Sequence, residues 1–246
     1  MMMQLQAIPR PRVAVALTAL LLAPACAMRA QLGMEAPGRP AVSWQSSSGG
    51  AAKASEVRPG QDTEAELLAE LREAERTGTD NLALANTLYN LAILRREQGD
   101  FAEAEQLYRR VLETREREEG PSHPDVAATL NNLAGLEAAR GNYDVAQPLL
   151  ERALSIRQTA LGTEHALTAQ SLNNLALLYA AQGNAAAAEP LYQRALSILE
   201  KAEAPQQDDL GRVLDNYAAL LHDTGREAEA GDLDARARVI RGAAGR

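Results

Sequence analysis

The chain repeats itself with a period of 42 residues, and this period limits its fold more than any other feature of the sequence. Eight positions hold the same residue type in four consecutive copies. The eight columns begin at Leu88, Asn90, Ala92, Leu94, Gly99, Ala104, Leu107 and Arg110 and recur at each step of 42. A period of this length is typical of an array of equal units that stack on one another.

Each copy carries two segments with the apolar periodicity of an α-helix. In the third copy, the first segment has its apolar residues at i, i+3, i+4 and i+7, which are Leu172, Leu175, Ala176 and Tyr179. The second segment repeats this spacing from Ala188 to Leu196. The sequence therefore predicts four helix–turn–helix copies, at about 84–121, 126–163, 168–205 and 210–242.

The turn between the two helices has a signal of its own. A glycine, Gly183 in the third copy, can take the left-handed conformation that ends a helix. The next residue is Asp100, Asn142 or Asn184 in the first three copies, and we expect its side chain to cap the second helix. Asp100 with Glu103 also matches a capping box.

Helix pairs of this kind cannot bury their apolar faces alone, so neighbouring pairs must stack. Ala176 and its equivalents are expected where the two helices of a pair cross, because only a small side chain fits there. Residues 62–78 predict an N-terminal capping helix, and Asp234 and Arg238 replace apolar residues in the last copy, as suits a terminal helix. The predicted fold class is all-α: a right-handed α-solenoid of stacked antiparallel helix pairs over 80–242.

Other folds share a period near 42. β-Propeller blades need alternating β patterns, which the sequence lacks. HEAT and armadillo repeats are helical and stay open as an alternative.

Residues 1–27 predict a signal peptide. Arg10 and Arg12 precede an apolar run from Val13 to Ala23, which is too short to span a bilayer and matches the core of a signal peptide. Cys26 is the only cysteine, and Ala25 before it resembles part of a bacterial lipobox. The signal is therefore either an ordinary secretory signal or a lipoprotein signal that leads to acylation of Cys26.

Residues 28–61 predict a disordered linker, because their prolines, serines and glycines cannot bury enough apolar surface to fold. We expect an exported protein that is periplasmic, anchored to the membrane as a lipoprotein through Cys26, or secreted. The intact mass of the exported chain tests this expectation, and a mass that retains residues 1–27 would contradict it.

Composition narrows the class of partner. The chain has 33 acidic and 25 basic residues and a formal net charge of −8, so it lacks the positive surface that nucleic acids require. The sequence has no HExxH, CxxC or P-loop motif. His123 and His165 are equivalent residues before a helix, which suggests a capping role. We therefore expect no enzyme, no metal and no cofactor.

The repeated motifs resemble tetratricopeptide repeats, in particular the 42-residue variety of kinesin light chains. The resemblance rests on Ser171-Leu-Asn-Asn-Leu-Ala-Leu-Leu-Tyr179, on Gly183-Asn184, on Glu189-Pro-Leu-Tyr-Gln-Arg-Ala-Leu196 and on the link Gly120-Pro-Ser-His-Pro-Asp125. It covers roughly residues 80–240 and implies a concave groove, lined by the first helix of each pair, in which an extended peptide binds.

Helical geometry, applied to this implied groove, predicts which residues line it. The polar candidates are Asn86, Tyr89, Arg96, Asn131, Gln170, Asn173, Arg212, Asp215 and His222, and the others are Ile93, Ala128, Gly135, Ala138, Leu177, Ala180 and Ala219. Asn131 and Asn173 are the best candidates, because amides can hydrogen-bond a peptide main chain. The recurring Asn90, Asn132, Asn174 and Asn216 lie nearer the seam between repeats, where a structural role is expected.

The middle copies carry alanine and glycine where a carboxylate-binding groove would carry Lys or Arg, which disfavours selective capture of an acidic peptide tail. The leading hypothesis is an exported adaptor that binds an extended peptide or partner protein in the groove. The alternative is an envelope lipoprotein that organises a larger complex through other surfaces. The oligomeric state stays open.

Overall fold

The computed structural model describes residues 61–202 and 207–244, and side chains over 64–202 and 207–242. The predicted signal peptide, Cys26 and all but the last residue of the predicted linker lie outside these residues.

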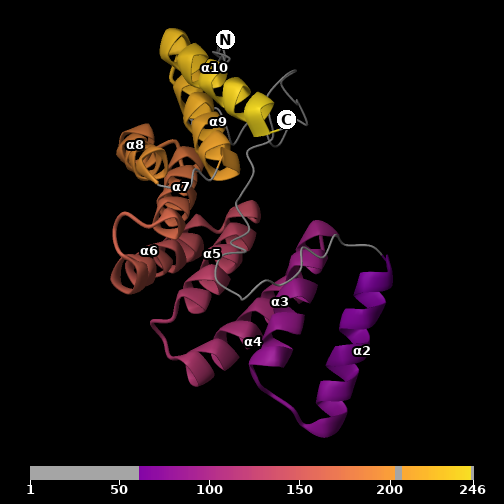
Figure 1. The fold of residues 1–246 in the computed structure, drawn as a ribbon. Helices are drawn as coiled ribbons and strands as arrows, with labels where there is room; N and C mark the ends of the chain where they lie inside the picture. The colour runs from indigo at the N-terminus through magenta and orange to yellow at the C-terminus, as the bar shows by residue number, and fades with distance from the viewer. Residues whose placement is uncertain (1–60, 203–206, 245–246) are drawn as a thin grey trace, which may run out of the picture. The chain divides into compact units, whose positions relative to one another are not determined.

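The described residues form nine α-helices and no strand (Figure 1). The helices are α2 (Gln61–Thr77), α3 (Leu82–Glu97), α4 (Phe101–Glu119), α5 (Pro124–Ala139), α6 (Tyr143–Leu161), α7 (Ala166–Ala181), α8 (Ala185–Lys201), α9 (Gln207–Asp223) and α10 (Glu227–Ala244). None of the helices described here is both long enough and apolar enough to cross a membrane.

The helices pack as four successive pairs: α3 with α4, α5 with α6, α7 with α8, and α9 with α10. The second helix of each pair also packs on the first helix of the next pair, and α5, α7 and α9 contact one another in turn. Figure 1 follows this order from the indigo α2 to the yellow α10. The predicted all-α solenoid of stacked helix pairs is confirmed.

The repeated apolar residues form the core. The leucines of the first column are at most 5% exposed, and the alanines predicted at the helix crossings are at most 1% exposed, in all four pairs. These residues are Leu88, Leu130, Leu172 and Leu214, with Ala92, Ala134, Ala176 and Ala218. Residues at the same repeat positions are buried in every helix pair, so the four copies are structurally equivalent.

The first helix of the described chain, α2, covers the segment for which the sequence predicts a cap at 62–78. It packs on α3, and Leu71 and Ala74 lie against the core of the first pair. Glu64 pairs with Arg95 of α3 at 2.5 Å. At the other end, Arg238 is exposed and Asp234 is partly exposed on α10.

The turns agree with the sequence in part. Gly183 has a φ of 76°, the left-handed conformation expected at a helix end. Asn184 accepts a hydrogen bond from the Ala187 amide at 3.1 Å and so caps α8.

The caps predicted for the first two copies are wrong. Asp100 and Asn142 make no side-chain cap. Asn142 instead donates to Glu137 at 2.7 Å, and Glu103 pairs with Arg95 at 2.8 Å rather than closing a capping box. Asn142 and Glu103 thus bond to charged side chains in place of the expected cap and capping box, and hydrogen bonds to charged partners are the stronger ones.

The arginines of the last repeated column, which begins at Arg110, form ion pairs that link the helix pairs to earlier segments. Each arginine contacts a glutamate of an earlier segment: Arg110 with Glu75, Arg152 with Glu116, Arg194 with Glu164, and Arg236 with Glu200. These side chains are largely exposed, so water screens the attraction and each pair adds little stability.

Close packing at the crossings can be tested with matched alanine substitutions. Ala176 is fully buried in the core between the third and fourth pairs, so Ala176→Leu should lower the free energy of unfolding by about 1–3 kcal/mol through overpacking. Ala186 is exposed on α8, so Ala186→Leu should change it by less than about 0.5 kcal/mol. Urea unfolding followed by circular dichroism measures both. Equal effects of the two substitutions would contradict the packing described here.

Candidate protein-interaction surface

The predicted lining residues lie on α3, α5, α7 and α9, and we call their side of these helices the first-helix face. Its ends are more exposed than its middle. Asn86, Arg212 and His222 are exposed, Arg96, Gln170 and Asp215 are partly exposed, and Tyr89, Asn131 and Asn173 are buried. The small residues Ala128, Gly135 and Ala138 of α5 are also buried. The structure therefore keeps the lining residues of α9 accessible and, except for Tyr89, those of α3, whereas those of α5 are covered.

An amide ladder runs along the seam between the first helices. Each recurring asparagine from the second copy onward donates its Nδ2 hydrogen to the side chain 43 positions earlier. The three bonds are Asn132 to Tyr89 Oη at 2.6 Å, Asn174 to Asn131 Oδ1 at 3.4 Å, and Asn216 to Asn173 Oδ1 at 3.1 Å. The structural role expected for these asparagines is confirmed for Asn132, Asn174 and Asn216.

The two amides predicted as the best peptide ligands belong to this ladder. Asn131 is 1% exposed, and its Nδ2 donates to Ala127 O at 3.0 Å and to Ser171 Oγ at 3.1 Å. Asn173 is fully buried and lies beside Asn174. Both amides therefore hold neighbouring repeats together, and their contact with a partner stays a prediction.

A buried arginine crosses the seam between the first two pairs. Arg115 extends from α4 and donates through Nη1 to Asp125 O and Thr129 Oγ1 on α5, both at 3.0 Å. Its Nη2 donates to Asn86 Oδ1 on α3 at 2.9 Å. The guanidinium also lies 4.8 Å from the centre of the Tyr89 ring, a cation–π contact. Arg115 thus joins three helices around one cation.

The next seam repeats this arrangement incompletely. Arg157, 42 residues after Arg115, donates through Nη1 to Leu167 O at 2.8 Å and to Ser171 Oγ at 3.1 Å on α7. The side chain is fully buried, but its Nε and Nη2 have no hydrogen-bond partner. Burial lowers the pKa of Arg157 to about 10, because the charged form is poorly solvated there.

Sequence reasoning missed this pair of arginines because it searched only the first helices for lining residues. The signal that could have found them is present: Arg115 and Arg157 are equivalent positions near the ends of two second helices. Long side chains at such positions can cross to the neighbouring helix.

The lining residues of the last pair have partners within the chain. Asp209 accepts from Arg212 at 2.7 Å and from Gln170 at 2.8 Å. His222 contacts Asp234 at 3.1 Å and Glu227 at 2.6 Å. Hydrogen bonds to Asp234 and Glu227 raise the pKa of His222, since both carboxylates favour the charged imidazolium. These contacts give this end of the first-helix face both positive and negative groups.

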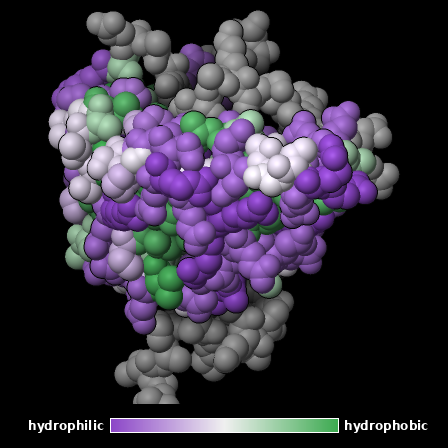
Figure 2. Space-filling model, turned by 90° about the horizontal axis from the view of Figure 1, so that it is seen from below, coloured by the Kyte–Doolittle hydropathy of each residue, from purple (hydrophilic) through white to green (hydrophobic). Residues whose placement is uncertain are grey.

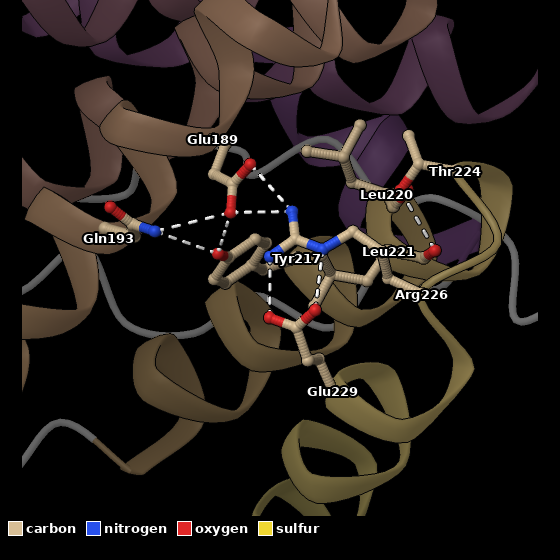
Figure 3. A network of polar contacts seen from close by, with 8 residues as sticks. All are labelled: Glu189, Gln193, Tyr217, Leu220, Leu221, Thr224, Arg226 and Glu229. Atoms are coloured by element: carbon tan, nitrogen blue, oxygen red, sulfur yellow. Dashed lines mark hydrogen bonds and ion pairs between the residues drawn. The ribbon is translucent and has the colours of Figure 1, made fainter.

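A further polar network fastens the third pair to the fourth (Figure 3). Arg226 contacts Glu189 of α8 at 2.8 Å and Glu229 of α10 at 2.6 Å. Tyr217 of α9 donates to the same Glu189 at 2.7 Å and accepts from Gln193 at 3.0 Å. Helix α9 and the turn before α10 therefore meet α8 at Glu189, whose pKa is lowered by the hydrogen bonds from Tyr217 and Arg226.

One group among the described side chains has the residue types of a metal site. The ligand atoms of Glu119, His123 and Asp125 lie within 4.8 Å of one another. However, His123 Nδ1 accepts the Asp125 backbone N–H at 3.2 Å, which caps α5 as the sequence predicts. His165 caps α7 in the same way. A metal at His123 Nδ1 would replace this cap, so the group is best explained as a helix start.

On the face seen in Figure 2, hydrophilic residues dominate and hydrophobic ones form narrow strips between them. Within the described part of the chain, Val145 and Val239 are the large apolar side chains that are exposed. A partner that binds the face seen in Figure 2 would therefore be recognised through polar contacts more than through a broad apolar patch.

These features define a repeat protein built from stacked antiparallel helix pairs. The tetratricopeptide repeat model matches residues 62–117, 83–159, 125–201 and 167–243, which together span most of the sequence. The chain belongs to the tetratricopeptide repeat family. Proteins of this family generally act as scaffolds for protein interaction rather than as enzymes.

Solved structures of the same fold support this assignment. BtubC (BKLC) from P. vanneervenii is 25% identical, with a TM-score of 0.64 and 75% of each chain covered. A Podosopora anserina protein named as a putative kinesin light chain with nearly identical TPR-like repeats is 23% identical, with a TM-score of 0.59 over 76% of this chain and 89% of that one. A second structure under that name has a TM-score of 0.61 at 23% identity, over 74% and 86% of the two chains. No curated protein is similar enough to count as a relative.

The amide ladder predicts a cost for removing one amide. Asn216→Ala leaves the buried Asn173 Oδ1 without its donor, which should lower the free energy of unfolding by about 1–3 kcal/mol. Asn90→Ala is the matched control, because the Asn90 side chain makes no hydrogen bond within the described residues and should change the free energy by less than about 0.5 kcal/mol. Urea titrations measure both. If Asn216→Ala lowers the free energy of unfolding no more than Asn90→Ala does, the amide ladder does not stabilise the seam.

Proposed function

We propose that this protein is an exported interaction scaffold that binds an extended segment of a partner protein on the first-helix face. The observation that carries the proposal is the contact of α5 with α7 and of α7 with α9. Because successive first helices touch, their faces join into one surface that runs across repeats. An extended segment can then contact several pairs at once.

The chemistry of this surface suits a peptide. Ala180 and Ala219 are small and partly exposed, so they leave room for a main chain. Asn86 and Arg212 are exposed at the two ends and can donate hydrogen bonds to its carbonyl groups. A peptide bound in this way would offset its ordering entropy with many modest contacts.

Export rests on the sequence of residues 1–27. Attachment of a lipid at Cys26, and with it an organising role in the envelope through other surfaces, is the alternative to groove binding. The two functions differ in the face of the solenoid that contacts the partner: groove binding needs the first-helix face, and the organising role uses other surfaces.

Bulky substitutions can separate these two functions. Ala180→Trp with Ala219→Trp places two indoles on the first-helix face, whereas Ala186→Trp with Ala235→Trp places them at exposed sites on the second helices α8 and α10. Partners recovered with wild type from envelope extract should be lost with the first variant and kept with the second, as quantitative mass spectrometry measures. Equal recovery with both variants would argue against the first-helix face, and loss with the second variant alone would favour the alternative.

A further inference from the structure

The outer side of α10 differs from the outer sides of the other second helices. We define the outer α10 face by these exposed residues: Gly231, Asp232, Ala235, Arg238 and Val239. At the position of Gly231, the helices α4, α6 and α8 carry Glu105, Gln147 and Glu189, and at the position of Ala235 they carry Arg109, Glu151 and Gln193. At the position of Val239 they carry Glu113, Ser155 and Ser197. Helix α10 therefore lacks the long polar side chains that the equivalent helices carry here.

Packing within the chain does not explain this composition. Gly231 lies inside the helix, where glycine is one of the least stabilising residues. A Cβ atom at Gly231 would meet no neighbouring atom within 4 Å, so no close contact among the described residues requires a glycine there. Val239 is 72% exposed, the more exposed of the two large apolar side chains that reach solvent in the described chain. A second helix that packs on this face would explain both residues.

Two opposite charges on the outer α10 face are left over by the ion pairs of the fold. The other charged side chains of α10 pair within the chain: Glu227 and Asp234 with His222, Glu229 with Arg226, Arg236 with Glu200, and Arg241 with Asp215. Asp232 and Arg238 make neither an ion pair nor a hydrogen bond with any residue that the structure describes. They lie three positions before and three positions after Ala235, so an acid and a base flank this alanine symmetrically.

This symmetry matches a second copy of the same helix. When two identical helices pack antiparallel about a twofold axis, residues at equal distances on either side of the axis face each other. With the axis at Ala235, Asp232 of each copy faces Arg238 of the other, and Val239 of each copy faces Gly231 of the other. Each charge then meets an opposite charge, and each exposed valine meets a position without a side chain.

We propose that two copies of this protein associate through the outer α10 face, with the two α10 helices antiparallel about a twofold axis at Ala235. This inference goes beyond the proposed function and does not depend on it. Ala235 and Gly231 let the helix axes approach to about 8 Å, the short end of the usual range. One helix from each copy buries less area than the roughly 1,200–2,000 Å² of a standard interface, so the dimer is weak, with a dissociation constant of about 10–100 µM.

The test is sedimentation velocity of the full chain from about 5 to 500 µM, a range that brackets this dissociation constant. Wild type should convert reversibly from monomer to dimer. Asp232→Arg and Arg238→Asp each place like charges opposite one another at both symmetric contacts. Either substitution alone should therefore raise the dissociation constant by at least about tenfold.

Mixing the two single variants tests the antiparallel arrangement. A chain with Asp232→Arg has two arginines at these positions, and a chain with Arg238→Asp has two aspartates. An equimolar mixture restores both ion pairs in the heterodimer, so it should dimerise within about threefold of wild type although each variant alone does not. Placing both substitutions in one chain exchanges the two charges and should also restore the dimer.

The controls separate loss of the contact from loss of the fold. Glu113→Arg reverses an exposed charge on α4, at the position equivalent to Val239, and should leave dimerisation unchanged. Ala235→Gln restores the side chain that Gln193 provides on α8, so it should fold normally, as circular dichroism checks. Its longer side chain blocks the close approach and should raise the dissociation constant by at least about tenfold.

Three results would overturn the inference. A wild-type chain that stays monomeric over the whole concentration range has no such contact, whatever other partner binds α10. Dimerisation that Asp232→Arg and Arg238→Asp leave unchanged places the contact elsewhere on the molecule. A mixture of the two variants that stays monomeric excludes the antiparallel arrangement. The binding of an extended segment on the first-helix face is unaffected by any of these results.

Discussion

The stacking of one helix pair on the next is the constraint on which the rest of this structure depends. No pair can bury its apolar face without a neighbour, so stability comes from the seams as much as from the pairs themselves. The repeated leucines and alanines fill the space within and between pairs. The same stacking sets the first helices side by side, and this is the only reason that they can present one surface to a partner.

The polar groups of the seams fix how the pairs are placed. A seam made only of apolar contacts tolerates small shifts of one helix pair along the next. A buried amide or guanidinium does not, because the fold loses stability when such a group is separated from its acceptor. Asn132, Asn174 and Asn216 each reach back to the preceding copy, and Arg115 meets three helices at once. Arg157 shows what happens when one acceptor is missing, because its Nε and Nη2 are left buried without a hydrogen-bond partner.

Much of the fold could be predicted from the sequence, because the signals that specify it are local and repeated four times. Helical periodicity, the left-handed glycine of the turn and the small residues at the crossings each follow from the chain alone. The caps expected at Asp100 and Asn142 were wrong, and at Asn142 the amide bonds to the Glu137 carboxylate instead, a contact that the repeat pattern does not indicate. The candidate surface was harder to predict. Helix geometry places Asn131 on a face of α5, but it does not predict that Ser171 and Asn174 bond to Asn131. It also does not predict that Arg157, on the second helix α6, extends to Ser171 on α7.

The most direct test of the account is to remove one full period. Deleting residues 126–167 joins Asp125 to Thr168 in the same register, so Arg115 meets Ser171 where it met Thr129, and α4 packs on the equivalent of its former neighbour. If the pairs are interchangeable units that stack at a step of 42, the shortened chain keeps its helical content per residue and unfolds cooperatively in urea, as circular dichroism measures. Loss of the helical signal on deletion would show that the pairs are not interchangeable and would contradict the account.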